Sequence, residues 1–150
     1  MCQVKNEARI YRSYILEIKL REDVKLLIGK LGLLGFKRGS YFYVGSGKKN
    51  LLSRISRHLK KDKKRFWHID YFLSSDKVFI KNVWISSKRE CVLSYSFFKR
   101  GFSYIENFGS SDCKCQSHLF FSKNRLSELK KVLEELNLRK LNISDAYSRN

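Results

Sequence analysis

The segment YFYVGSGKKNLLSRISRHLKK, residues 41–61, decides the fold class because two periodicities meet within it. Side chains alternate along a strand, so Tyr41 and Tyr43 share one face of the aromatic run at its start. Two glycines then permit a sharp turn. Residues 50–61 predict a helix, because leucines and an isoleucine recur along one side of it. A strand joined by a glycine turn to an amphipathic helix indicates an α+β domain.

The rest of the chain supplies further elements of the same kinds. Strands are predicted at 13–20, 41–45 and 77–86, and helices at 50–61, from 87 onward and at 122–140. Residues 22–40 favour turns and short extended pieces, because each internal glycine costs about 1 kcal/mol in a helix. Ser87 and Glu90 fit a capping box at the start of the helix after 86. We therefore expect one domain over residues 1–150, ending in the amphipathic helix at 122–140 and a polar tail at 141–150.

Charge points to a polyanionic partner. The chain has 150 residues, of which 43% are hydrophobic, enough to bury one core. Its net charge is +18, from 32 Lys and Arg against 14 Asp and Glu. Such an excess favours nucleic acid first and an anionic membrane surface second. A generally lysine-rich proteome would account for part of it.

The basic residues are concentrated in one short segment. Residues 48–65 hold nine Lys or Arg and one Asp, which gives +8 of the total. A phosphate-binding track is expected there. Its candidate nucleic-acid-binding residues are Lys48, Lys49, Arg57, Lys60, Lys61, Lys63, Lys64 and Arg65. Phe66, Trp67 and Tyr71 are candidates for stacking on bases, with core packing as the alternative for at least two of them.

Compartment follows from what the sequence lacks. It contains no run of 18 apolar residues and no signal-peptide pattern at its start, so a cytoplasmic, intracellular protein without a membrane partner is expected. The four cysteines are then reduced thiols or metal ligands.

Short strings along the chain carry a family resemblance. They are YFYVGSG at 41–47, SRISRHL at 53–59, WHIDYFL at 67–73, EC at 90–91 and FGSSDCKCQSHLFF at 108–121. Together they resemble the GIY-YIG nuclease family, and most closely its uncharacterised DUF123-like branch, which occurs alone or fused to endonuclease III. The resemblance covers about residues 12–121, the expected domain core. It implies a small three-stranded antiparallel sheet flanked by helices, with the amphipathic helix added at the C-terminal end.

The first tyrosine of the family signature has two placements. Gly39-Ser40-Tyr41 matches the triplet literally, but 39–45 forms only one strand, and the family needs two tyrosines on neighbouring strands. Arg12-Ser13-Tyr14 fits that geometry, although Arg12 stands where glycine is usual. We therefore expect Tyr14 and Tyr43 in the site. Ordinary core packing is the alternative for either tyrosine.

The resemblance implies a metal-dependent endonuclease acting on DNA, in DNA repair or in structure-specific cleavage. In this scheme Tyr14 is the base, and a metal and Arg54 lower its pKa. Tyr43 positions water or phosphate. Arg54 stabilises the transition state, and His58 orients the nucleophile or phosphate. His68 is a second positioning residue, and Asp70 either orients it or reaches the metal through water. Core packing with a satisfied histidine is the alternative for WHIDY at 67–71.

The metal expected at this site is Mg²⁺ or Mn²⁺, with Glu90 as its carboxylate ligand. A glutamate that only caps its helix is the alternative. On sequence alone, Arg54 and His58 are also compatible with two solvated cations of a basic helix.

The cysteine segment leaves three readings open. Cys113, Cys115 and His118 together with Cys91 offer four ligands for a tetrahedral Zn²⁺ site. Buried free cysteines are the commoner explanation for thiols in a small core. Alternatively, residues 110–112 line the active site. For the function of the whole chain, the endonuclease has two alternatives. One is a nucleic-acid-binding module without catalysis, which Arg12 in place of glycine makes possible, and the other is a zinc-stabilised interaction domain.

Overall fold

The computed structural model describes residues 10–47, 50–122 and 126–143. The strands are β1 (Ser13–Leu20), β2 (Val24–Leu27), β3 (Leu33–Phe36), β4 (Gly39–Ser46), β5 (Val78–Ser86), β6 (Ser103–Tyr104), β7 (Leu119–Ser122) and β8 (Arg139–Leu141). The helices are the 3-10 turn η1 (Gly29–Leu31), α2 (Leu51–Leu59), α3 (His68–Leu73), α4 (Glu90–Lys99) and α5 (Leu126–Glu135).

A six-stranded antiparallel sheet in the order β6-β7-β4-β1-β5-β8 forms the centre of the domain. Its three middle strands are the three that the sequence predicts, and the α+β class is confirmed. The expected small three-stranded sheet is wrong in size, because β7 pairs with β4 and β8 pairs with β5. Strands β2 and β3 form a separate hairpin within the glycine-rich segment, as short extended pieces.

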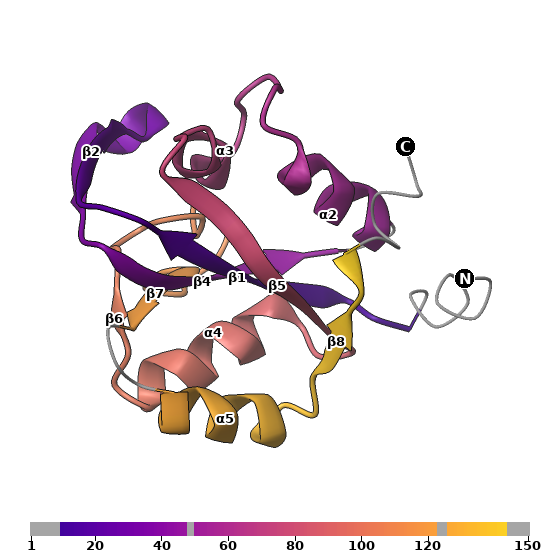
Figure 1. Cartoon of the computed structure of the whole chain (residues 1–150). Coiled ribbons are helices and arrows are strands. Elements are labelled where there is room, and N and C mark those ends of the chain that lie inside the picture. The colour runs from indigo at the N-terminus through magenta and orange to yellow at the C-terminus, as the bar shows by residue number, and fades with distance from the viewer. Residues whose placement is uncertain (1–9, 48–49, 123–125, 144–150) are drawn as a thin grey trace.

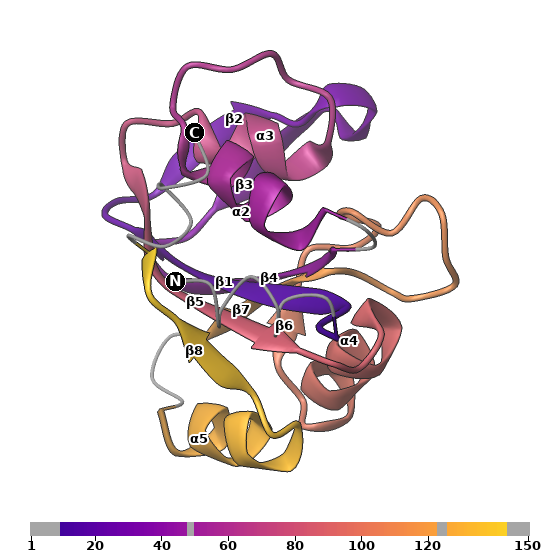
Figure 2. The same cartoon turned by 90° about the vertical axis from the view of Figure 1, so that its right-hand side faces the viewer.

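Helices cover both faces of the sheet, giving three layers (Figure 1). One face carries α2 and α3, and the other carries α4 and α5, as the view turned by 90° also shows (Figure 2). Alternation along each central strand divides its side chains between two cores. Leu16 and Tyr43 pack toward α2 and α3. Ile15 and Phe42 pack toward α4 and α5.

Two predicted boundaries in the second half of the chain are wrong. Helix α4 begins at Glu90, its N-cap is Arg89, and the N-cap makes no side-chain hydrogen bond, so the Ser87–Glu90 capping box does not form. The helix predicted at 122–140 is shorter, because Asn137 turns the chain with a φ of 50° before β8.

The C-terminal end is less polar than the sequence indicates. Leu141 is buried, and Ile143 packs against the core on the α2 side of the sheet. The rest of the predicted tail, 144–150, lies outside the described residues. Among the described helices, none has both the length and the apolar character needed to cross a bilayer.

Gly45 allows the phenol ring of Tyr14 to lie flat against β4. The two residues face each other in the β1–β4 ladder. A Cβ placed on Gly45 would lie 2.2 Å from Tyr14 Cζ, closer than any real contact. The ring therefore occupies the space that a side chain would need, which explains why glycine follows Tyr43 by two positions.

We expect Gly45→Ala to destabilise the protein by about 1–3 kcal/mol, because the extra methyl group must push a buried ring out of place. The matched control is Gly35→Ala, since Gly35 also lies in a strand but a Cβ there meets nothing within 4 Å. Urea unfolding of both variants measures the difference. Equal stability of the two would contradict the packing of Tyr14 against Gly45.

Candidate active site

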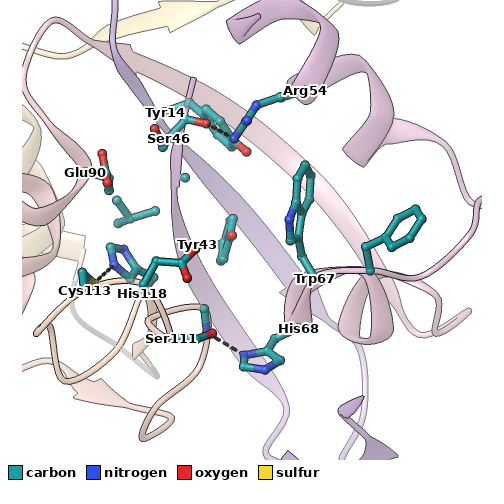
Figure 3. A pocket seen from close by; sticks show the side chains of 15 residues that line it. Tyr14, Tyr43, Ser46, Arg54, Trp67, His68, Glu90, Ser111, Cys113 and His118 are labelled. Atoms are coloured by element: carbon teal, nitrogen blue, oxygen red, sulfur yellow. Dashed lines mark hydrogen bonds between the residues drawn. The ribbon is translucent and has the colours of Figure 1, made fainter. Parts of the chain in front are cut away.

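The site lies at one end of the three central strands of the sheet, where the start of β1 meets the ends of β4 and β5. Ser13, at the start of β1, pairs with Ser46 at the end of β4 and with Ser86 at the end of β5. Helix α2 begins shortly after the end of β4, and α4 begins shortly after the end of β5. A cavity of about 210 Å³ opens here, lined by Tyr14, Tyr43, Val44, Gly45, Ser46, Arg54, Phe66, Trp67, His68, Glu90, Gly109, Ser111, Asp112, Cys113 and His118 (Figure 3).

A buried group at this end of the sheet consists of Tyr14, Tyr43 and His58. The hydroxyl oxygen of Tyr14 lies 2.6 Å from His58 Nε2. The imidazole also contacts the Tyr43 ring edge to face, with centroids 5.9 Å apart. His58 Nδ1 is buried and has no hydrogen-bond partner among the described residues. Burial, with a smaller contribution from Lys63, lowers the pKa of His58 to about 3, so this imidazole is neutral at pH 7. It is a buried hydrogen-bond partner of the Tyr14 hydroxyl, not the solvated cation of the alternative interpretation.

Both tyrosines stay protonated in this environment. Burial raises the pKa of Tyr14 well above its ordinary value, and Arg54 lowers it by less. Burial likewise raises the pKa of Tyr43. The net shift of Tyr14 is therefore opposite in direction to the sequence expectation, because desolvation of the phenolate outweighs the nearby guanidinium. The literal triplet residue Tyr41 does not line the cavity and donates its hydroxyl to the carbonyl of Lys37.

Arg54 and Glu90 bring opposite charges to the cavity. Arg54 Nη1 donates to the carbonyl of Ser46 at 2.9 Å, which fixes the guanidinium over the end of β4. Glu90 enters from the first turn of α4. Within the described part of the chain, its carboxylate has no hydrogen bond or ion pair. A fixed guanidinium and an uncommitted carboxylate that line the same cavity can bind an anion and a cation within it.

Asp70 does not serve the cavity as expected. It lies outside the lining, is fully buried, and makes a bidentate ion pair with Arg57 at 2.8 Å from each oxygen. Its Oδ2 also accepts the backbone N–H groups of Phe66 and Trp67. Burial raises the pKa of this carboxyl, but these hydrogen bonds outweigh burial and the net shift is downward. His68 is positioned instead through Nδ1, which accepts the N–H of Gly109 at 2.8 Å.

The predicted phosphate track divides into two groups. Lys61 Nζ donates to three backbone carbonyls, and Lys63 Nζ donates to three others. These two lysines and Arg57 therefore hold the loop after α2 in place. Lys60, Lys64 and Arg65 are exposed to solvent, whereas Lys48 and Lys49 lie outside the described residues.

The fold brings three cysteines and a histidine together beside the cavity. The ligand atoms of Cys91, Cys113, Cys115 and His118 all lie within 4.8 Å of one another. Cys113 Sγ is 3.1 Å from His118 Nε2, and Ser94 Oγ is 2.8 Å from His118 Nδ1. This Cys3His group could hold a metal ion.

The loop that carries part of this group also forms one wall of the cavity. Ser111 and Asp112 line it, as one sequence interpretation expected, whereas Ser110 is buried outside the lining. Sequence reasoning missed Gly109, which has a φ of 69° and leaves room for the Tyr43 ring. The glycine directly after Phe108 in the string FGSSDCKCQSHLFF could have indicated a close approach of the backbone at this position.

One comparison with known proteins identifies a family. The family model described as "Domain of unknown function DUF123" matches residues 13–140. No curated protein and no solved structure matches the chain.

Acid should destabilise the protein through His58. Its pKa is about 3 in the folded chain and near 6.5 when unfolded, so the unfolded state binds the extra proton between these values. The stability that the neutral imidazole contributes is present above pH 6.5 and is lost as the pH falls. We expect His58→Gln to flatten this dependence by at most about 1.4 kcal/mol per pH unit. Urea unfolding of both proteins from pH 7 to pH 4 measures it, and parallel curves would refute the assignment.

Proposed function

This chain belongs to the DUF123 family, and we propose that it is a metal-dependent endonuclease of GIY-YIG type that hydrolyses phosphodiester bonds in DNA. The observation that carries the proposal is the meeting of Tyr14, Tyr43, Arg54 and Glu90 in one cavity, with His58 hydrogen-bonded behind Tyr14. Hydrolysis of a phosphodiester needs an anion-binding group, a route for the proton of water and a cation ligand. A side chain in or directly behind this cavity can meet each of these requirements.

Arg54 is the group that takes the phosphate. Its guanidinium is held by the Ser46 carbonyl at the cavity wall, so little side-chain freedom remains to be lost when an anion binds. Guanidinium donors stabilise the charge that develops on the phosphoryl oxygens in the transition state. The net charge of +18 favours a polyanionic substrate over a small phosphate ester.

Tyr14 and His58 provide the route for the proton. A tyrosine with a raised pKa is a poor base alone, but its hydroxyl already points at a neutral imidazole 2.6 Å away. The negative charge of a bound phosphate raises the pKa of His58 above its value in the empty cavity. The proton of the attacking water then passes to the Tyr14 oxygen while the phenol proton passes to His58 Nε2. The new oxygen–phosphorus bond forms, the bond to the leaving oxygen breaks, and that oxygen takes a proton from solvent.

Glu90 fits the role of ligand for Mg²⁺ or Mn²⁺. Its carboxylate lines the cavity without a protein partner among the described residues, and these hard cations accept one carboxylate together with waters and substrate oxygens. A cation bound there would polarise a phosphoryl oxygen and lower the pKa of water.

The Cys3His group has a different donor set and a different role. Three thiols and an imidazole suit Zn²⁺, whose tetrahedral bonds of about 2.0–2.3 Å require only a small closing of the four donors. His118 presents Nε2 to the thiols, and its Nδ1 lies 2.8 Å from Ser94 Oγ. In a metal-bound imidazole this Nδ1–H would donate to Ser94 and orient the ring. Because Cys91 follows Glu90 directly, zinc here would fix the start of α4 against the cavity loop. We therefore assign it a structural role.

DNA is favoured over RNA, and DNA repair or structure-specific cleavage is the proposed setting, on the resemblance to the GIY-YIG nucleases and their fusions with endonuclease III. A nucleic-acid-binding module without catalysis is the second candidate, favoured by Arg12 in the position where the family has glycine. The cleavage experiment below separates the two.

Loss of Arg54 or Glu90 should abolish cleavage much more than binding. We expect Arg54→Ala to lower the single-turnover rate on labelled DNA with Mg²⁺ by about a hundredfold or more, because it removes a donor to the transition state. Glu90→Gln should be equally damaging, with weak rescue by excess Mg²⁺. A panel of single strands, duplexes and branched DNA identifies the substrate first, with EDTA as the blank.

Tyr41→Phe is the matched control, because Tyr41 is as buried as Tyr14 but lies outside the cavity. Tyr14→Phe should lower the rate and Tyr41→Phe should not. Parent rates in both Arg54→Ala and Glu90→Gln would overturn the mechanism. DNA binding without cleavage under any divalent cation would establish the non-catalytic module instead.

Purified protein should carry about one zinc per chain. We expect Cys113→Ser to lose the metal and to lower the melting temperature, because metal binding to the folded site stabilises it. Cys2→Ser is the control, since it removes the one cysteine outside the proposed ligand set. Metal analysis and thermal unfolding measure both effects, and a fully stable protein without zinc would exclude the site.

A further inference from the structure

Two aromatic side chains stand in the open at the mouth of the cavity. Phe66 is 67% exposed and Trp67 is 39% exposed, and both line the cavity beside Arg54. Figure 3 shows the Trp67 ring standing between Arg54 and His68. Rings in such a position are removed from solvent only when a ligand covers them, so their exposure indicates a binding surface.

The backbone that carries these rings is held rigidly. The buried Asp70 carboxylate accepts the N–H groups of both residues, at 2.8 Å for Phe66 and 2.9 Å for Trp67. Burying a carboxylate costs several kcal/mol unless it is fully paired, and Arg57 completes its pairing. The domain thus uses a buried ion pair to present two exposed aromatic rings in one fixed place.

Cations surround the rings. The Arg57 guanidinium lies over both, 5.8 Å from the Phe66 centroid and 4.6 Å from that of Trp67. Lys64 Nζ is 5.5 Å from the Phe66 centroid, and Arg54 is 5.3 Å from that of Trp67. The two arginines cover part of Trp67, so Phe66 has the larger open surface. An apolar protein segment would have to desolvate these charges, whereas a base with its phosphates would pair with them.

We propose that Phe66 and Trp67 form a stacking platform for an unpaired nucleobase next to the phosphate that Arg54 binds. This inference rests on the proposed function and specifies its substrate class. In a duplex, both faces of a base are already stacked on neighbouring bases. The platform therefore selects nucleic acid with an unstacked nucleotide beside the bond to be cut, such as a single strand, a flap or an extruded base.

The test separates bases from phosphates by affinity. The full-length protein is titrated with a short oligothymidylate and with an abasic strand that has the same number of phosphates. Stacking on an aromatic ring is worth about 1–3 kcal/mol per base, so oligothymidylate should bind about fivefold to a hundredfold more tightly. Phe66→Ala and Trp67→Ala should move this ratio toward one and leave binding of the abasic strand unchanged. Phe66→Tyr should keep the ratio.

Phe79→Ala is the matched control. Phe79 is 38% exposed and has the Arg21 guanidinium 5.0 Å from its ring, but it pairs with Lys19 near the far end of β1. Its removal should leave the ratio intact. Equal affinity of the parent for both strands, or an unchanged ratio in Phe66→Ala and Trp67→Ala, would overturn the platform while leaving the nuclease proposal standing. Failure of every nucleic acid to bind would overturn both, and base-dependent binding without cleavage would support the platform and refute the nuclease.

Discussion

The packing of the Tyr14 ring against Gly45 is the contact on which the site depends. It joins the two central strands β1 and β4 at the end of the sheet where the cavity opens, and it places the phenol hydroxyl against His58 of α2. Strand, neighbouring strand and helix are thereby fixed relative to one another through one side chain. A residue with a Cβ at position 45 would remove the space for that ring, so the glycine serves close packing and not a special backbone conformation.

Part of the positive charge of residues 48–65 stabilises the fold itself. Lys61 donates to carbonyls between the end of α3 and the start of β5, and Lys63 donates to carbonyls at the C-terminal end of α2. Arg57 neutralises Asp70. Burial lowers the pKa of Lys63 to about 8, which shows how far its ammonium group is withdrawn from water. The exposed Lys64 lies over the Phe66 ring and Arg54 lies over the Trp67 ring, so proposed phosphate contacts and proposed base contacts share one surface.

The loop between β6 and β7 connects the wall of the cavity to the Cys3His group. Gly109 binds His68 on one side of the cavity, while Cys113 and His118 belong to the Cys3His group on the other. Cys91 completes that group from the residue after Glu90. In the proposed mechanism, zinc in the Cys3His group keeps Glu90 and the loop at a fixed separation, so the site is preorganised for the catalytic cation and the substrate.

The sequence by itself determined the elements whose signals are local. The alternation in Tyr41–Gly45 and the apolar side of the helix that follows come from periodicity. The choice of Tyr14 over Tyr41 came from the family resemblance, which implies two tyrosines on neighbouring strands, and Tyr14 does line the cavity. Only the tertiary structure decided the rest. β7 and β8 are short strands of four and three residues, stabilised by their neighbours more than by their own pattern. Asp70, Lys61 and Lys63 read as site residues or a phosphate track in the sequence, because composition records charge but not which carbonyl or guanidinium it meets. The meeting of Cys91 with Cys113, Cys115 and His118 depends on how α4 and the loop pack on the sheet, and no spacing along the chain encodes a contact made by two segments so far apart.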